Sequence, residues 1–278
     1  MPDSSSPSVI VIGSGAVRAL PTRGGPSYLV QIGERRLLFD CGRIAVHNLH
    51  RFGFPAETID EVYITHLHFD HISDLPLLLL LSWNNGRDAR IPIFGPRGID
   101  HFLENGVRQA YQDDIDSRIA HGNRERDKLD WETTEITRDG LIYQNKDYTI
   151  ETLATAHAGL RNFSYRITTG DKVIVITSDS EPDPRLVHFC RDADLLLVEC
   201  SGTKAFYDSV AFGGWHLTPE DVGQIARDAK VKRVVLKHFV IESFSDDPKI
   251  AESMAETVRA IHPDGEIHAG EDGMRFDL

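Results

Sequence analysis

The sequence has few cysteines, no long apolar run and a shortage of basic residues. Its three cysteines, Cys41, Cys190 and Cys200, form neither a disulfide framework nor a CxxC metal motif, and they suit a reducing cytoplasm. The most apolar stretch, "LPLLLLLS" at 75–82, is too short to span a bilayer and predicts a buried helix. The opening "MPDSSSPS" has no signal-peptide pattern. We therefore expect a cytoplasmic protein without a membrane partner.

The charge balance is strongly acidic. Thirty Lys and Arg residues stand against 43 Asp and Glu, which gives a formal net charge of −13. Proteins that bind the phosphate backbone of nucleic acids depend on Lys and Arg, so a nucleic-acid partner is not expected. A small anionic substrate remains compatible, because bound metal cations can reverse the local potential.

Length and composition fit one large α/β domain. The chain has 278 residues, of which 41% are hydrophobic and 26% charged, enough to bury a sizeable core. We expect a single domain over residues 1–278, made of two similar halves at roughly 1–155 and 156–278. A highly charged segment at about 112–146 predicts a surface insertion, with a lid or a dimerisation arm as alternatives. A homodimer is therefore one possible assembly.

Strand-like runs are grouped before and after this charged segment. Early runs are "SVIVIG", the hairpin "SYLVQI" and "RRLLFD", and "EVYIT"; later runs are "YTIETLAT", "FSYRIT", "KVIVITS", "DLLLVEC" and "RVVLKHF". Two helices are predicted among the later runs. One has Thr218 as its N-cap and Pro219 at its first position, and the other is "DPKIAESMAETVRAIH".

Ligand-type side chains follow several predicted strands. The segment "THLHFDH", Thr65 to His71, follows "VYI", and further donors stand at the ends of three later strands. Strand ends can bring distant side chains together, and seven donors exceed the three or four that one zinc ion uses. A two-metal site is therefore predicted from His66, His68, Asp70, His71, His157, Asp179 and His238.

The other histidines are interpreted as ordinary surface or core residues. A lone histidine is more often structural than metal-binding, and none of these belongs to a comparable cluster. They are His47, His50, His101, His121, His188, His262 and His268. The loop "GSGAVR" is only a weak dinucleotide-binding pattern, because Arg18 replaces its third glycine.

The motifs resemble the metallo-β-lactamase superfamily. HxHxDH matches His66 to His71, and the branch of ribonuclease Z, the phosphonate-pathway phosphodiesterase and the zinc arylsulfatases is most similar. The branch features are "GSGAVRALPTRGG", "LLFDCG", "THLHFDHISDLP", "IFGPRG", "WHLTPEDVGQIA", "LKHF" and "EDGMRF", spread over nearly the whole chain. The resemblance implies a four-layer αββα sandwich with the site at one edge of its two sheets.

The resemblance also implies a ligand assignment. His66, His68 and His157 would hold one metal, Asp70, His71 and His238 the other, and Asp179 would bridge them. Ser178 stands where the family usually has glycine. Histidine at position 68, rather than the glutamate of the iron-containing members, favours two Zn²⁺ ions, with Mn²⁺ or another divalent metal as alternatives.

Three further residues are assigned roles outside the ligand set. Glu199 and His216 resemble the pair that the ribonuclease Z branch uses for proton transfer, whereas the alternative is a strand-end charge and a helix-flanking residue. Arg161, four residues after His157, is a candidate clamp for an anionic substrate, with an ordinary surface arginine as the alternative.

Together these features predict a hydrolase of a small phosphodiester or a related anionic ester. A metal-bridging hydroxide would be the nucleophile, Asp70 would orient it, and His216, held by Glu199, would protonate the leaving oxygen. Alternatives are an arylsulfatase-like or a lactonase/β-lactamase-like hydrolase. Further from expectation are a ribonuclease Z-type nuclease, whose substrate-gripping arm has no counterpart between His157 and Asp179, and a non-catalytic metal-binding module.

Overall fold

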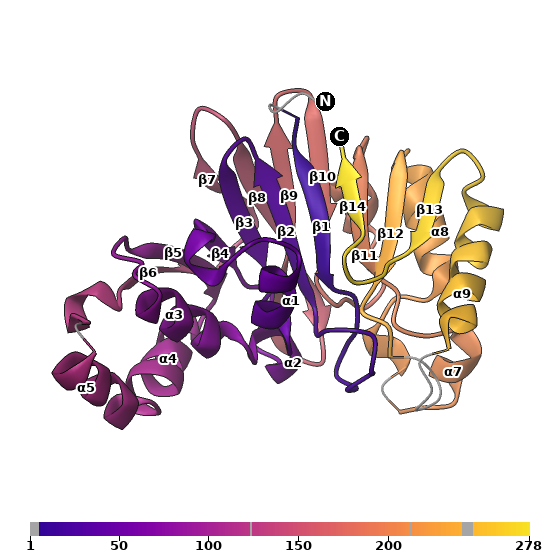
Figure 1. Ribbon diagram of the computed structural model, residues 1–278. Coiled ribbons are helices and arrows are strands. Elements are labelled where there is room, and N and C mark those ends of the chain that lie inside the picture. Colours follow the sequence, from indigo (N-terminus) through magenta and orange to yellow (C-terminus); the bar gives the residue numbers. More distant parts are fainter. Residues whose placement is uncertain (1–5, 123, 212, 241–246) are drawn as a thin grey trace.

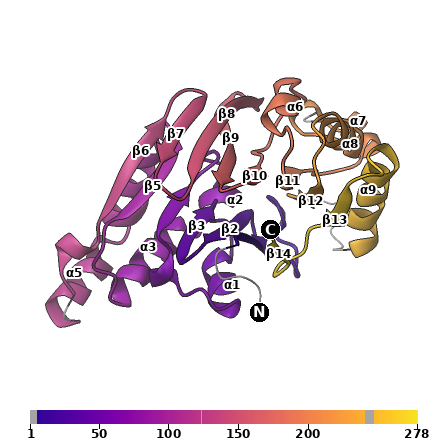
Figure 2. The same ribbon diagram turned by 90° about the horizontal axis from the view of Figure 1, so that it is seen from above.

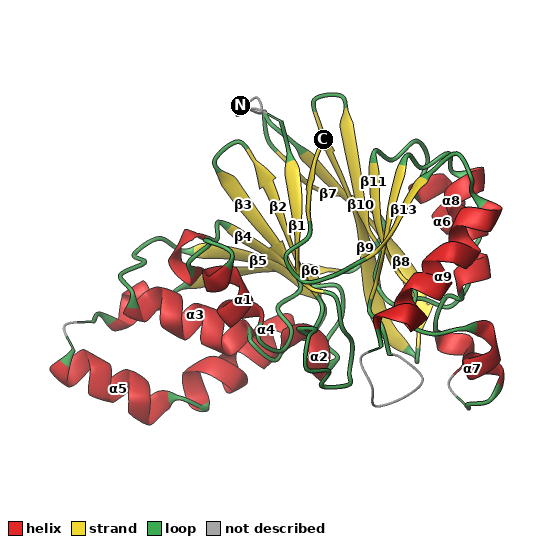
Figure 3. Cartoon of the chain, turned by 45° about the vertical axis from the view of Figure 1, so that its right-hand side comes forward, coloured by secondary structure: helices red, strands yellow, loops and turns green. Residues whose placement is uncertain are grey.

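Two seven-stranded sheets lie face to face, with helices on their outer sides (Figures 1 and 3). The computed structural model describes residues 6–122, 124–211, 213–240 and 247–278. The strand order is β14-β1-β2-β3-β4-β5-β6 in the first sheet and β13-β12-β11-β10-β9-β8-β7 in the second. The predicted αββα sandwich is confirmed.

Most of the strands match the apolar runs of the sequence. The first sheet contains β1 (Ser8–Gly13), β2 (Ser27–Ile32), β3 (Arg35–Phe39), β4 (Glu61–Tyr63), β5 (Ile91–Pro96), β6 (Trp131–Ile136) and β14 (Arg275–Asp277). The second contains β7 (Gly140–Gln144), β8 (Thr149–His157), β9 (Leu160–Thr169), β10 (Lys172–Ile176), β11 (Leu195–Glu199), β12 (Arg233–Lys237) and β13 (Glu266–Ala269). The expected hairpin is β2–β3, which turns through Gly33 at a φ of 56°.

Helices cover the outer face of each sheet (Figure 2). Beside the first sheet lie α1 (Ala45–Arg51), α2 (Phe69–Ile72), α3 (Leu75–Asn84), α4 (Ile99–Leu103) and α5 (Gln112–His121). Beside the second lie α6 (Arg185–Phe189), α7 (Lys204–Asp208), α8 (Pro219–Asp228) and α9 (Pro248–Ile261). Helix α8 begins at the predicted cap, where Thr218 and Asp221 form a capping box. Within the described chain, no helix is long and apolar enough to cross a membrane.

Apolar side chains form three buried layers. One lies between the first sheet and its helices, one between the second sheet and its helices, and one between the two sheets. Parallel strands β10, β11 and β12 carry apolar side chains into both the second and the third layer. Burial on both faces explains why these runs are almost continuously hydrophobic.

The charged segment at 112–146 is largely regular structure. It contains α5 and the strands β6 and β7, which form the last strand of the first sheet and of the second sheet, respectively. The chain therefore changes sheets between Ile136 and Gly140, ahead of the division expected near residue 155. Edge strands tolerate charged side chains because one edge remains unpaired, which explains the composition of this segment.

The ligand-type residues lie together at one end of the sandwich. Strands β3, β4, β8, β10, β11 and β12 all run toward this end, where α2 and α7 also lie (Figure 1). Residues that immediately follow these strands therefore meet across the two sheets.

Candidate metal centre

The first half of the chain contributes four of the predicted ligands from one short segment. Strand β4 ends at Tyr63, and the chain turns into α2, which begins at Phe69. His66, Asp70 and His71 are buried, whereas the His68 side chain is only partly covered. A single strand–turn–helix connection thus presents this segment to the space between the sheets.

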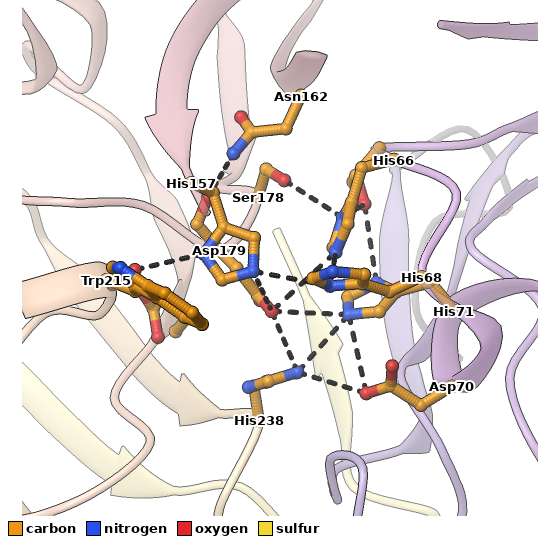
Figure 4. A network of polar contacts seen from close by, with 12 residues as sticks. His66, His68, Asp70, His71, His157, Asn162, Ser178, Asp179, Trp215 and His238 are labelled. Atoms are coloured by element: carbon orange, nitrogen blue, oxygen red, sulfur yellow. Dashed lines mark hydrogen bonds and ion pairs between the residues drawn. The ribbon is translucent and has the colours of Figure 1, made fainter. Parts of the chain in front are cut away.

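The second half contributes three ligands, each from a different strand end. His157 is the last residue of β8, Asp179 follows β10, and His238 follows β12. All three are buried. Figure 4 shows their side chains pointing toward the histidines of the first half.

Asp179 lies at the centre of the cluster (Figure 4). Its Oδ2 atom lies 3.0 Å from His238 Nε2, 3.4 Å from His71 Nε2, 3.8 Å from His157 Nε2 and 3.9 Å from His66 Nε2. One carboxylate oxygen therefore approaches imidazoles from both halves, an arrangement suited to a ligand shared by two ions.

Two sets of donors are close enough to hold metal ions. One contains His66, His68, His157 and Asp179, and the other contains Asp70, His71 and His238; within each set the donor atoms lie within 4.8 Å of one another. His216 forms a third combination with Asp179 and His238. Among the described residues, none of the other histidines joins such a set.

Hydrogen bonds determine which nitrogen of each ring faces the cluster. The Nδ1 atoms of His71, His157 and His238 contact Asp40 Oδ2 at 2.8 Å, the Trp215 carbonyl at 3.0 Å and Ser201 Oγ at 2.8 Å, respectively. Such contacts leave Nε2 available as a metal ligand.

The other two rings approach each other directly. His66 Nδ1 lies 3.0 Å from Thr65 Oγ1, and its Nε2 lies 2.8 Å from His68 Nδ1. His68 Nδ1 also lies 3.3 Å from His157 Nε2. His68 therefore faces the cluster through Nδ1, whereas the other rings use Nε2.

Burial and the surrounding carboxylates shift the pKa values in opposite directions. Burial lowers the pKa of His66 and of His68. Burial also opposes protonation of His71, but Asp179 and Asp40 outweigh it and raise the His71 pKa. Desolvation lowers the His238 pKa, yet Asp179 and Asp70 raise it to about 9 overall. The cluster thus attracts positive charge, which a proton or a metal ion can supply.

The donor set fits divalent metals. Imidazole nitrogens with a few carboxylates suit zinc and similar ions. Asp179 Oδ1 is buried without a hydrogen-bond partner among the residues that the structure describes. A buried, unpaired carboxylate oxygen is costly unless a cation contacts it. The charge of Asp70 also suits a cation. Burial raises the Asp70 pKa, but His71 and His238 lower it to about 2, so the carboxylate is anionic.

Glu199 and His216 form a separate pair beside the metal cluster. Glu199 Oε2 lies 3.1 Å from His216 Nδ1 and accepts a hydrogen bond from Ser201 Oγ at 2.8 Å. Its Oε1 accepts the amide protons of Ser180 at 2.8 Å and Leu217 at 3.1 Å. Burial would raise the Glu199 pKa, but His216 lowers it. Conversely, burial lowers the His216 pKa, and Glu199 raises it above its ordinary value.

Arg161 lies outside the cluster. It is exposed and pairs with Ala156 across the β8–β9 hairpin, whereas His157 pairs with Leu160. Directly opposed residues project to the same face, so Arg161 leaves the hairpin on the face opposite to His157. Its role as a substrate clamp stays a prediction.

Sequence reasoning missed the groups that orient the ligands. Asp40 was visible as a carboxylate at a strand end, within "LLFDCG", and it also accepts the Thr65 amide at 2.8 Å. Ser178, the departure from the family pattern, is accommodated, since its amide donates to Ser164 Oγ at 2.9 Å. The Trp215 carbonyl had no sequence signal, because every residue carries one.

The sequence and fold are similar to those of known metal-dependent hydrolases. The family described as Anti-Pycsar protein Apyc1 matches residues 8–246. A ribonuclease Z of Mycolicibacterium gilvum is 30% identical over 244 residues, which cover 84% of this chain and 84% of the relative. The probable metallo-hydrolase YhfI of Bacillus subtilis is 30% identical over 222 residues, 76% of this chain and 78% of YhfI.

Solved structures support the same fold. The crystal structure of YhfI, a metallo-β-lactamase fold protein, superposes with a TM-score of 0.76 at 23% identity and covers 98% of this chain and 100% of YhfI. A diphosphatase from the PhnP family superposes with a TM-score of 0.71 at 19% identity, covering 98% and 97%. These similarities establish the metallo-β-lactamase fold.

Proposed function

The chain belongs to the family described as Anti-Pycsar protein Apyc1, and from this premise we propose that it hydrolyses a small phosphodiester or a related anionic ester with two zinc ions. It is a metallo-hydrolase of the metallo-β-lactamase fold with a His/Asp metal site. The phosphodiester, the number of ions and their identity are the parts that we propose.

The position of His216 carries this proposal. Its ring centroid lies 4.9 Å from that of His157 and 5.7 Å from that of His238, one ring from each ligand set. His216 Nδ1 faces Glu199, so Nε2 is the nitrogen left for a substrate. An imidazole beside a two-metal site, held by a carboxylate, suits proton donation to a leaving oxygen.

The chain's own residues would divide the chemistry as follows. His66, His68 and His157 would hold one ion, Asp70, His71 and His238 the other, with Asp179 between them. When bound, two divalent ions supply a hydroxide nucleophile at neutral pH and stabilise the charge that develops on the ester. Asp70, whose Oδ2 lies 3.4 Å from His238 Nε2, would orient the nucleophile.

Proton transfer to the leaving group would fall to His216. Glu199 raises the His216 pKa, so the proton that the departing alkoxide needs is present near neutral pH. Four donors hold Glu199 in place, which keeps the His216 ring in one orientation. A mere metal-binding module would have no use for this pair.

A substrate panel tests the proposal directly. Purified protein with measured metal content is assayed on aryl and alkyl phosphodiesters, a phosphomonoester, a sulfate ester, a lactone and a thioester. We expect the phosphodiesters to be cleaved fastest, with activity lost on chelation and restored by Zn²⁺ or Mn²⁺. Faster turnover of the sulfate ester or the lactone would favour the arylsulfatase-like or lactonase-like alternative.

A ribonuclease Z-type nuclease is the second candidate, because relatives with that name match most of the chain. Two features oppose it. The net charge of −13 disfavours a polyanionic RNA. Strands β8, β9 and β10 also follow one another through short turns, so they leave no room there for a substrate-gripping arm. Cleavage of a precursor tRNA faster than small phosphodiesters would decide in its favour.

We also propose a cytoplasmic location and a homodimeric assembly. The three cysteines are free and buried, consistent with the cytoplasmic location that we propose. Helix α5, within the charged segment at 112–146, lies at the periphery of the molecule beyond the first sheet (Figure 1), and we propose it as the contact of a homodimer. Sedimentation of the purified protein tests this, since a monomer at micromolar concentration would exclude it.

A further inference from the structure

A second polar cluster is linked by hydrogen bonds to the backbone of His238. At its centre is Asp272, in the loop between β13 and β14. Asp272 Oδ1 accepts hydrogen bonds from the Ser14 amide and the Ser14 hydroxyl, both at 2.8 Å. Its Oδ2 accepts the Gly24 amide at 2.6 Å and Asn48 Nδ2 at 3.0 Å. One carboxylate therefore joins three separate segments of the first half.

Arg23 reinforces the same cluster. It is almost fully buried, and its Nη1 donates to Ser14 Oγ at 2.8 Å and to the Gly270 carbonyl at 2.5 Å. Its guanidinium also lies over the Phe239 ring, 4.7 Å from the centroid. Ser14 is thus held by Asp272 and Arg23 together.

Ser14 in turn holds the backbone of a metal ligand. The Ser14 carbonyl accepts the amide proton of His238 at 2.9 Å and that of Phe239 at 3.3 Å. His238 has a φ of 63°, in the left-handed region that side chains other than glycine rarely adopt. A backbone in this region persists only when its surroundings hold it there.

We propose that Asp272 is a positioning residue for the ion held by Asp70, His71 and His238. It fixes Ser14, and Ser14 fixes the turn that aims the His238 imidazole at the cluster. The set of His66, His68 and His157 does not receive this support. The inference rests on the proposed two-metal site. It gives the loop between β13 and β14 a role in binding one of the two ions, through the position of His238.

The hydrogen-bond inventory makes Asp272→Asn informative. All four partners of Asp272 donate hydrogen bonds, so both oxygens are needed as acceptors. An asparagine of nearly the same size turns one acceptor into a donor, whichever way its amide is oriented. The variant therefore weakens the cluster without opening a cavity.

The experiment measures zinc binding rather than turnover. Zinc titration of the metal-free protein gives the two affinities in wild type, Asp272→Asn and the control Asp194→Asn. Asp194 is a buried carboxylate that accepts the Val173 amide at 2.8 Å, at the opposite end of the second sheet. We expect one affinity to fall ~10–100-fold in Asp272→Asn, as for other groups that orient a metal ligand, and neither to change in Asp194→Asn.

Double variants identify which ion is affected. Asp272→Asn combined with His238→Ala should bind zinc like His238→Ala alone, because both changes act on the same ion. Asp272→Asn combined with His157→Ala should lower the zinc affinity of both sites, because the two changes act on different ions. Two results would show a general structural role and overturn the inference. One is an equal fall in the zinc affinity of both sites in Asp272→Asn, and the other is a further fall in zinc affinity when Asp272→Asn is added to His238→Ala.

Two further results keep the test decisive. Ser14→Ala keeps the carbonyl that His238 uses but removes the hydroxyl, so it should give a smaller shift in the same affinity, even if Asp272→Asn fails to fold. Unchanged affinities in both variants would overturn the inference while leaving the proposed function intact. Wild-type protein that binds only one zinc ion would overturn both.

Discussion

The first half of the chain places four expected ligands within the segment His66–His71, whereas the second half places three on three separate strands. The first group is oriented partly by its own segment, because Thr65 contacts His66, and partly by Asp40, which directly follows the adjacent strand β3 and contacts His71. The second group relies on distant partners, such as the Trp215 carbonyl for His157. A contiguous group is built by one turn, but a dispersed group requires the whole fold.

This difference has a consequence for robustness. Damage to one support in the second half should affect one ligand, because each ligand has its own partner. Damage in the first half should affect several, because Asp40 and Thr65 are bonded to each other as well as to the rings. Changes at the two kinds of support therefore test the comparison.

The largest effect is expected for Asp179→Ala, the residue at which the two halves meet. Its carboxylate approaches imidazoles of both ligand sets, so its loss should reduce the content from about two ions to less than one. Elemental analysis measures this, with Asp183→Ala as a control in the same segment and His66→Ala as a single-ligand comparison. Metal retention equal to wild type would contradict a bridging position.

His216→Ala should keep both metals but slow hydrolysis ~10²–10⁴-fold, as expected for loss of a general acid. The loss should be smaller for esters with weakly basic leaving groups, such as a nitrophenolate, which need little protonation. The measurement is a leaving-group series on wild type and variant, alongside metal analysis. Equal slowing across the series, or loss of metal, would make His216 structural.

Asp40→Asn separates the two kinds of ligand support. Asp40 accepts hydrogen bonds from the amide and hydroxyl of Thr65 and contacts His71, and Thr65 also contacts His66. The affinities for both ions should therefore fall, by ~10–100-fold for the ion held by His71. Ser201→Ala, which removes a partner of His238, should shift zinc binding less, since the His238 backbone stays held by Ser14. A larger shift for Ser201→Ala than for Asp40→Asn would reverse the comparison.

Glu199→Gln should give a milder form of the His216→Ala phenotype and a shifted pH profile. Glu199 raises the His216 pKa, so the proton donor stays charged as the pH rises. Without the carboxylate charge the pKa falls, and the alkaline limb of kcat should move to lower pH. Rate against pH for both proteins is the measurement, and an unmoved limb would separate Glu199 from the proton donor.

The smallest effect is expected for Arg161→Ala. The side chain is exposed and lies on the opposite face of its hairpin from His157, so any anion contact is solvated. We expect KM to rise by less than about tenfold with kcat and metal content unchanged, because exposed charge pairs contribute ~1 kcal/mol or less. A large fall in kcat would instead place Arg161 at the reacting group.

The local features were predictable from the sequence. The ligand segment, the buried strands β10–β12 and the capped start of α8 each follow from patterns within about ten residues, which is the range over which periodicity and capping act. The meeting of the seven ligand-type residues at one end of the sandwich was also predictable, because the ends of the strands converge there.

The remainder depended on tertiary context. Strands β6 and β7 were not recognised, because "WETTEI" and its neighbours carry the charges that an edge strand tolerates. Arg161 was placed near the ligands by its spacing from His157, but the tight turn at Ala158 and Gly159 directs it to the other face. The carbonyls of Ser14 and Trp215 act through the backbone, which leaves no mark in the sequence.

The position of β14 in the first sheet implies an order of events during protein synthesis. Strand β14 pairs with β1, and the Ser14–Asp272 hydrogen bond closes a loop of 258 residues. A nascent chain whose residues beyond β13 are still inside the ribosome has a β1 edge without its partner and a His238 turn without its anchor. Such long-range closure is slow compared with local folding. We therefore expect metal capture to follow the emergence of β14 from the ribosome, so that zinc supply after that point governs activation.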